Sequence, residues 1–343
     1  MKKNKVLVLI VCLVVAVVLG FGAYFSGNWL TSEKNSVKIG IVLYNINDTF
    51  LSGMMTEFDE IAREHEQLTG IQIDINLVGS MESQATQNSQ VERFISLGYD
   101  VLVVNLVDRT SASHIINRAM DANIPIVFFN REPVQGDLNK WDHLFYVGSD
   151  ARTSAELEAQ IIIDRYNEDP RSIDLNGDGV IQYVMLEGER RHQDAIIRTE
   201  FSVQALRDAG LEVEKIAGNV ANWDLSQARA ITEKIMLEQG DEIEVIICNN
   251  DDMALGAAKA MEDLGLDFSN IVGIDGTEAG VAAVDSGKLL GTVKVDVYKH
   301  AKAIFDIAFA LAMEKDVYSE IIWEIEEDKS VRVPMEIYTK TTD

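Results

Sequence analysis

Two successive series of short apolar runs alternate with longer amphipathic stretches along this chain. The first series contains VKIGIVLY, IQIDINLVG, DVLVVNLVD and IPIVFFN; the second begins after HLFYVGSD and contains IQYVMLEG, LEVEKIAGN, IEVIICNND and NIVGIDG. The stretches between the runs have helical periodicity over about 10–15 residues, which is typical of a parallel sheet covered by helices on both faces. Because the pattern restarts, we expect an α/β protein with two doubly wound parallel sheets.

The carboxyl ends of the predicted strands carry amides, acids and aromatic residues. Ligands of open parallel sheets bind at this edge. The candidate positions there are residues 44–50, Asn105, Asn130 with Arg131, Asn250 with Asp251, and Asp275. No glycine-rich phosphate loop follows these runs, and the sequence has no Gly-x-Ser-x-Gly, His-Glu-x-x-His or Cys-x-x-Cys motif. A nucleotide site and the usual hydrolase and zinc sites are therefore not expected.

Residues 1–30 have the features of a signal anchor or a signal peptide. Lys2, Lys3 and Lys5 precede an uncharged apolar run from residue 6 to residue 25. About 20 helical residues span a bilayer core of roughly 30 Å, whereas the apolar region of a cleaved signal usually has about 7–15 residues. The sequence is consistent with two alternatives, a retained membrane anchor and a signal peptide cleaved after Gly22. In either case the basic flank stays inside and the chain after Trp29 is exported, to the cell surface or the periplasm.

The composition is that of a folded, acidic protein. Of the 343 residues, 47% are hydrophobic and 25% are charged, which suits two domains with buried cores. The net charge of −26 argues against a nucleic-acid partner, because such a partner requires lysine and arginine gathered on one face.

The string DLNGDGVIQYV at residues 174–184 matches the first part of an EF-hand-type calcium loop. Its oxygen ligands at positions 1, 3, 5, 7 and 9 would be Asp174, Asn176, Asp178, the carbonyl of Val180, and Gln182. Position 12 normally supplies a bidentate glutamate, but here it is Met185. A calcium site would therefore need a ligand from elsewhere in the chain; the alternative is an ordinary Asp/Asn/Gly surface turn.

Several stretches, in order and spacing, resemble the family of bacterial galactose/glucose-binding periplasmic proteins. They are VVNLVD, IPIVFFNREP, FYVGSD, DLNGDGVIQYVMLEGE, ANWDLSQA, IEVIICNNDDMALGA, GIDGTE, SGKLLGTV and VRVP. The resemblance runs from about residue 37 to residue 338. It implies two α/β lobes, residues 37–148 with 296–332 and residues 149–295 with 333–343, joined by hinges near Ser149, Val295 and Val333.

The resemblance also implies a calcium site and a sugar site. Glu244 would complete the calcium loop with both of its carboxylate oxygens. Phe50 and Trp223 would stack on the two faces of a pyranose, whose hydroxyl rim requires planar donors and acceptors. The hydrogen-bonding set would be Asp48, Asn130, His192, Asp194, Arg198, Asn250 and Asp275, with Arg131 as a cation beside it. Asn105 would lie behind these residues rather than touch the sugar.

One position departs from the family pattern, because Val295 stands where the family has an asparagine that contacts the sugar. Losing such a contact costs about 1–3 kcal/mol, so the identity of the sugar stays open. A deoxy or differently configured hexose, or a pentose, is the alternative to glucose or galactose.

The predicted function is a monomeric monosaccharide-binding protein that carries out no reaction. It would deliver sugar to the membrane permease of an ABC importer; the alternative is a membrane-anchored sensor that presents sugar to a histidine kinase or chemoreceptor. A glycosidase would need Asp48 with Asp194 or Asp275 as paired carboxylates. A repressor of the same fold would need a helix-turn-helix in place of the N-terminal apolar run.

Overall fold

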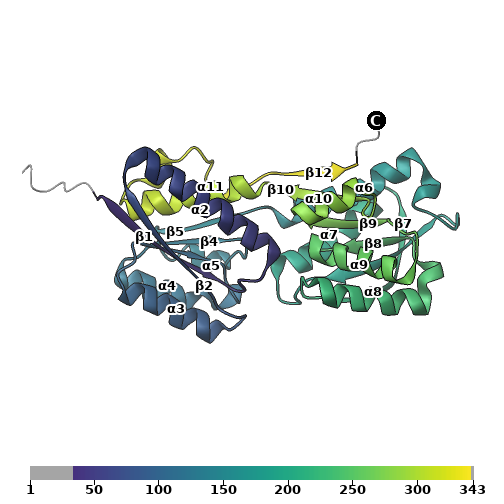
Figure 1. Ribbon diagram of the computed structural model, residues 1–343, viewed down its shortest axis with the longest axis horizontal. Helices are drawn as coiled ribbons and strands as arrows, with labels where there is room; N and C mark the ends of the chain where they lie inside the picture. The colour runs from purple at the N-terminus through teal and green to yellow at the C-terminus, as the bar shows by residue number, and fades with distance from the viewer. Residues whose placement is uncertain (1–33, 341–343) are drawn as a thin grey trace, which may run out of the picture.

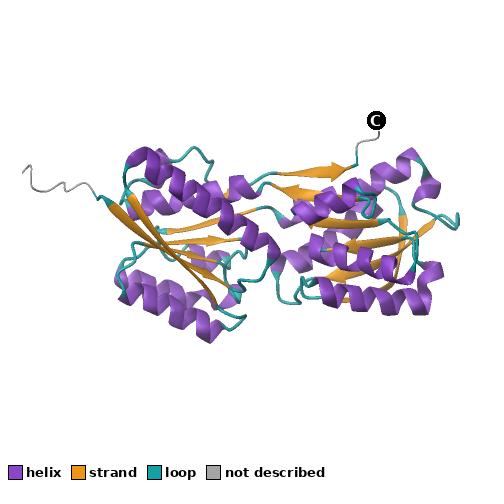
Figure 2. Ribbon diagram, viewed as in Figure 1, coloured by secondary structure: helices purple, strands orange, loops and turns teal. Residues whose placement is uncertain are grey.

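The computed structural model describes residues 34–340, which form two α/β lobes side by side (Figures 1 and 2). Each lobe is built on a sheet of six strands, and the two separate sheets agree with the sequence-based prediction. Among the helices of the described residues, none is long and apolar enough to cross a membrane. The predicted anchor or signal segment, residues 1–30, lies outside the described residues.

The first lobe is a sheet with strand order β11-β5-β4-β3-β1-β2, in which neighbouring strands are parallel. Its strands are β1 (Ser36–Leu43), β2 (Gln72–Gly79), β3 (Val101–Val104), β4 (Ile126–Phe129), β5 (Leu144–Gly148) and β11 (Ser330–Arg332). One face is covered by α2 (Thr49–Thr69) and α11 (Val297–Ala312), and the other by α3 (Gln84–Ser96) and α4 (Ala112–Ala122). The short elements are η1 (Arg109–Ser111), α5 (Gln135–Leu138) and α12 (Val317–Glu320).

The second lobe repeats this winding with strand order β12-β10-β9-β8-β6-β7. Its strands are β6 (Val180–Glu187), β7 (Glu212–Val220), β8 (Val245–Cys248), β9 (Ile271–Asp275), β10 (Gly291–Val295) and β12 (Met335–Thr339). One face is covered by α6 (Ala151–Glu168) and α7 (Gln193–Asp208), and the other by α8 (Leu225–Gln239), α9 (Asp251–Leu264) and α10 (Glu278–Asp285). The short elements are η2 (Pro170–Ser172) and η3 (Gly240–Glu242).

The expectation of wholly parallel sheets is wrong at one edge strand. β12 pairs with β10 in the antiparallel direction, with Val295 opposite Met335 and Gly291 opposite Thr339. β11 and β12 are separated by two residues, and β11 belongs to the other sheet. The chain therefore reaches the second lobe directly from β11 and meets β10 at its carboxyl end, so β12 can only run back along it.

The chain passes between the lobes three times, from β5 to α6, from β10 to α11 and from β11 to β12. Two of these segments are joined by the Ser149 hydroxyl, which donates to the carbonyl of Val333 at 2.8 Å. Each sheet has an apolar core on both of its faces, and apart from the hinge residue Val333, which packs in a first-lobe core, the members of each core come from one lobe. The lobes are thus independent packing units connected by three strands of backbone.

Candidate functional site

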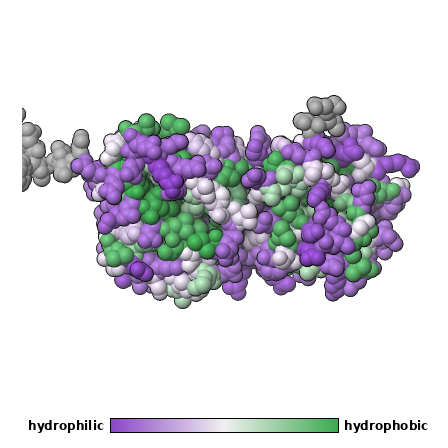
Figure 3. All heavy atoms as spheres, viewed as in Figure 1, coloured by the Kyte–Doolittle hydropathy of each residue, from purple (hydrophilic) through white to green (hydrophobic). Residues whose placement is uncertain are grey.

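The carboxyl ends of strands from both sheets surround a cavity between the lobes. The surface is hollowed where the lobes meet (Figure 3). The lining residues are Tyr44, Asp48, Phe50, Asn130, Arg131, His192, Asp194, Arg198, Trp223, Asn250 and Asp275. All ten side chains predicted for the sugar site are therefore gathered in one place, together with Tyr44.

On the first lobe, Asp48 and Tyr44 are held as a pair at the start of α2. Asp48 is the N-cap of this helix, and its Oδ1 accepts from the main-chain nitrogen of Leu51 at 2.9 Å. Its Oδ2 accepts from the Tyr44 hydroxyl at 2.6 Å. Each carboxylate oxygen has a second lone pair, so Asp48 keeps acceptor capacity toward the cavity while its orientation is fixed.

Asn130 and Arg131 follow β4 and form another part of the first-lobe wall. Asn130 has a left-handed backbone (φ 59°), and its side-chain oxygen accepts from the buried amide of Asn105 at 3.0 Å. Asn105 itself does not line the cavity, in line with its predicted place behind the wall. The Arg131 guanidinium lies 3.5 Å above the centre of the Tyr44 ring and donates to the carbonyl of Val107.

On the second lobe, the start of α7 supplies a histidine, a carboxylate and a guanidinium. His192 is the N-cap, and its Nδ1 accepts from the main-chain nitrogen of Asp194, which leaves the proton on Nε2. Burial, reinforced by Arg131 and Arg198, holds the pKa of His192 well below its usual value, so the ring is neutral. Asp194 lies 3.6 Å from Arg198 one helical turn later.

Arg198 is fixed from behind, with Nε donating to the Ser154 hydroxyl and Nη1 to the carbonyl of Asn249. Its remaining nitrogen is directed toward Asp194. Burial raises the pKa of the Asp194 carboxyl, while Arg198 lowers it. The pair presents charged donors and acceptors that are already desolvated, which strengthens hydrogen bonds to a polar ligand.

The aromatic wall of the second lobe is Trp223, which also has a left-handed backbone (φ 64°). Its ring meets His192 edge to face, with centroids 5.0 Å apart. A Cβ atom at Gly188 would lie 2.2 Å from Cζ2 of the indole, so only glycine fits beneath this ring. The place of Trp223 therefore depends on the absence of a side chain at residue 188.

Asn250 and Asp275 complete the second-lobe wall at the ends of β8 and β9. Asn250 is the N-cap of α9, with its side-chain oxygen accepting from Met253 and its amide nitrogen left as a donor. Asp275 is buried and has φ 133°, a conformation that costs energy in any residue with a side chain. Burial raises the pKa of Asp275 well above its usual value; Arg198 opposes this shift, and Asp251 and Asp48 add to it.

Tyr44 is the lining residue that the predicted sugar-binding set omitted, although residues 44–50 were among the candidate strand-end positions. It is the residue directly after β1, and its position at the carboxyl end of a strand was the available signal. Val295, the departure from the family pattern, is buried (3% exposed) in β10 and does not line the cavity.

The predicted calcium loop brings together the residues expected to supply its oxygen ligands. Glu244 is buried, and its two carboxylate oxygens accept from the main-chain nitrogens of Asn176 and Gln182 at 3.0 and 3.1 Å. The Gln182 side chain bonds to those of Asn176 and Asp178. Glu244 therefore does reach the loop, from a position 68 residues away.

The candidate ligand atoms are of the type that calcium prefers, since all of them are oxygens of carboxylates, amides or a main-chain carbonyl. In the part of the chain that the structure describes, no three histidine, cysteine, aspartate or glutamate side chains alone are close enough to form a metal centre. Asp174, Asp178 and Glu244 are therefore not gathered as a metal centre by themselves in these residues. A calcium ion here would also need oxygens from the amides of Asn176 and Gln182 and from the carbonyl of Val180.

Comparison with known proteins identifies the class to which this fold and site belong. Residues 39–316 match the model of the periplasmic binding protein domain, so the chain belongs to the periplasmic binding protein family. This is a family of solute-binding proteins rather than enzymes, which excludes the glycosidase alternative.

Among individual proteins, the chain is similar to the D-galactose/methyl-galactoside binding periplasmic protein MglB of Haemophilus influenzae. The two are 34% identical over 298 residues, which cover 87% of this chain and 88% of the relative. The chain is also 28% identical to a putative rhizopine-binding protein of Rhizobium meliloti, over 91% of this chain and 93% of the relative. Among solved structures, an ABC transporter solute-binding protein of Bacillus halodurans with bound myo-inositol matches with a TM-score of 0.73 and 28% identity, over 90% of this chain and 96% of that one.

Proposed function

We propose that this chain is an extracytoplasmic binding protein for a monosaccharide, with glucose or galactose as the expected ligand. The observation that carries the proposal is the make-up of the cavity. It has aromatic side chains from both lobes, Phe50 and Tyr44 from the first and Trp223 from the second, and a rim of carboxylates, amides and guanidinium groups. A pyranose has apolar C–H patches on its faces and hydroxyls on its edge, so this arrangement complements it.

Similarity to known proteins supports the same class of ligand. The relative from Haemophilus influenzae is named for galactose and methyl-galactoside, and the structure from Bacillus halodurans holds myo-inositol, a ring with hydroxyls around its rim. We propose delivery to the permease of an ABC importer as the use of the bound sugar. Presentation to a histidine kinase or chemoreceptor is the second candidate, favoured by the N-terminal apolar run.

A titration of the full-length protein with a panel of hexoses, deoxyhexoses and pentoses tests the proposal. We expect one monosaccharide to bind with 1:1 stoichiometry and glucose or galactose to compete for the same site. Pentoses belong in the panel because the valine at position 295 departs from the family pattern, even though its side chain does not line the cavity. If no monosaccharide binds at millimolar concentration, the proposed function is wrong.

We also propose that the loop at residues 174–182 binds calcium together with Glu244, because these residues supply the oxygen ligands described above. Its role would be structural, because the loop is not half of a paired EF-hand that could open.

A further inference from the structure

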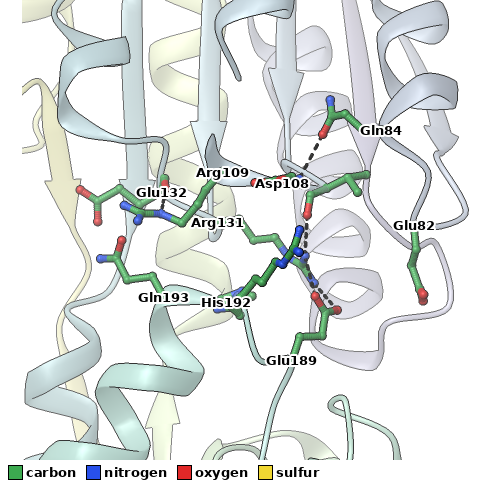
Figure 4. Close-up of a pocket in the computed structure, with 11 residues that line it drawn as sticks. Glu82, Gln84, Asp108, Arg109, Arg131, Glu132, Glu189, His192 and Gln193 are labelled. Atoms are coloured by element: carbon green, nitrogen blue, oxygen red, sulfur yellow. Dashed lines mark hydrogen bonds and ion pairs between the residues drawn. The ribbon is translucent and has the colours of Figure 1, made fainter. Parts of the chain in front are cut away.

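An ion pair joins the two lobes beside the candidate sugar cavity, which Arg131 also lines. Arg131 of the first lobe donates through Nη2 and Nη1 to the two carboxylate oxygens of Glu189 in the second, at 2.8 and 3.2 Å. Among the salt bridges of residues 34–340, this is the one that connects the lobes. Figure 4 shows the two side chains meeting in the wall of a second cavity. This cavity has a volume of about 270 Å³ and shares Arg131 and His192 with the candidate sugar site.

The two partners differ in how they are held. Arg131 is supported within its own lobe by the Tyr44 ring and the Val107 carbonyl, and its side chain is 6% exposed. Glu189 lies in the loop between β6 and α7, is 31% exposed, and has no place in the wall of the candidate sugar site. Separation of the lobes would leave Arg131 in position and remove only its bonds to Glu189.

We propose that the Arg131–Glu189 pair is a latch that favours the closed arrangement of the lobes in the absence of ligand. Glu189 then sets affinity without touching the sugar. A ligand that binds the closed form has an apparent Kd equal to the intrinsic Kd divided by the fraction of closed protein. Loss of the Arg131–Glu189 pair therefore raises the apparent Kd of every ligand by the same factor. The ratio of affinities between two ligands stays unchanged.

The substitution Glu189→Gln tests this directly, because it keeps the size of the side chain and removes its charge. Glu187→Gln is a matched control: Glu187 is 30% exposed, two residues away, and pairs with Lys215 inside the same lobe at 3.0 Å. We expect Glu189→Gln to lower the affinity for every sugar that binds, by the same factor of roughly 3- to 30-fold. The control should leave all of these affinities unchanged. A change in the ratio of affinities between two sugars would show instead that this region contacts the ligand, and would overturn the latch.

The dependence of sugar affinity on ionic strength gives a second test of the latch. The proposed ligands are uncharged, so an effect of ionic strength on their affinity must come from the protein. We expect sodium chloride to weaken binding to the unaltered protein and to the Glu187→Gln control, and to have little effect on Glu189→Gln. Equal salt dependence in all three proteins would contradict the latch.

This inference rests on the proposed function, but a measurement without ligand separates the two. Leu97→Cys and Leu237→Cys place spin labels at exposed positions on different lobes. We expect the label-to-label distances of the ligand-free protein to shift toward longer values in Glu189→Gln and to stay unchanged in Glu187→Gln. If the distribution is the same in all three proteins, the latch is wrong, whatever ligand the protein binds.

Discussion

At the scale of single residues, the candidate site is made of side chains whose positions are fixed by helix starts and strand ends. Asp48, His192 and Asn250 are all N-caps, so each uses one side-chain atom to begin a helix and turns the rest toward the cavity. A capping interaction is worth about 0.5–2 kcal/mol of stability. Replacing any of the three therefore changes folding as well as binding, and more selective substitutions are needed to test the site.

Gly188→Ala is such a substitution, because residue 188 supports Trp223 and does not line the cavity. The added methyl group would displace the indole, and we expect sugar affinity to fall roughly 2- to 12-fold, the value of an aromatic contact. Gly53→Ala is the matched control, since a Cβ there would meet nothing within 4 Å. Titration calorimetry on both variants gives the answer; unchanged affinity in Gly188→Ala would show that Trp223 does not stack on the ligand.

The raised pKa of Asp275 predicts that sugar binding releases protons. Sugar hydroxyls donate to the ionised carboxylate and favour it, so the pKa of Asp275 falls on binding. Affinity should then decrease as pH falls below the pKa of Asp275 in the free protein. Calorimetry in buffers of different ionisation enthalpy measures the released protons, and we expect Asp275→Asn to reduce their number.

The same shift has a consequence for stability, whose sign follows from linkage. A carboxyl group whose pKa is higher in the folded state costs stability once the pH exceeds its unfolded pKa, about 3.9 for aspartate. Asp275→Asn should therefore raise the melting temperature of the ligand-free protein near neutral pH and lose this advantage in acid. A variant that releases as many protons as the original would show that Asp275 is not the titrating group.

At the scale of elements, the calcium loop is the feature with the sharpest test. Calcium bound only by the folded state adds RT ln(1 + [L]/Kd) to stability, or about 2.7 kcal/mol when its concentration is 100 times the Kd. A chelator should thus lower the melting temperature. Glu244→Gln should remove this sensitivity, whereas Glu242→Gln, an exposed neighbour in η3, should keep it.

The comparison must be between melting temperatures with and without chelator, measured separately for each variant. Glu244 also holds two main-chain nitrogens, so its loss destabilises the loop even without metal. If protein shown to contain calcium melts at the same temperature after chelation, a stabilising calcium site is wrong.

The elements also show what a sequence can and cannot predict. Periodicity was sufficient for two sheets and for β1–β4 and β6–β9. Burial on both faces makes inner parallel strands such as β3 and β8 continuous apolar runs, whereas β2 and β7 at the sheet edges are only partly buried. The antiparallel direction of β12 was not predictable in this way, since it depends on where the chain crosses between lobes. Strand ends and family resemblance together predicted ten of the eleven residues that line the candidate site, all except Tyr44. They did not predict Glu189, which lies outside that site. Its partner lies 58 residues away in the other lobe, and a charged loop gives no local signal of such a pairing.

At the scale of the whole molecule, the two lobes have separate cores and share a cavity, so they should respond differently to the two proposed ligands. Sugar would contact both lobes and should slow amide hydrogen exchange at the strand ends that carry Asn130 in the first and Asp275 in the second. The calcium donors all lie in the second lobe, between Asp174 and Glu244. A chelator should therefore speed exchange in β6, β8 and the loop before them, and leave the first lobe unchanged.

Exchange measured by mass spectrometry on the full-length protein, with sugar and chelator added separately, distinguishes these patterns. Local opening within one lobe is expected because, in residues 34–340, no apolar core other than that containing the hinge residue Val333 is shared between the lobes, and three backbone crossings and the Arg131–Glu189 pair are the main connections. The first lobe serves as an internal control for calcium. If chelation speeds exchange equally in both lobes, the lobes unfold as one unit, and the view of them as independent bodies that close on a sugar does not hold.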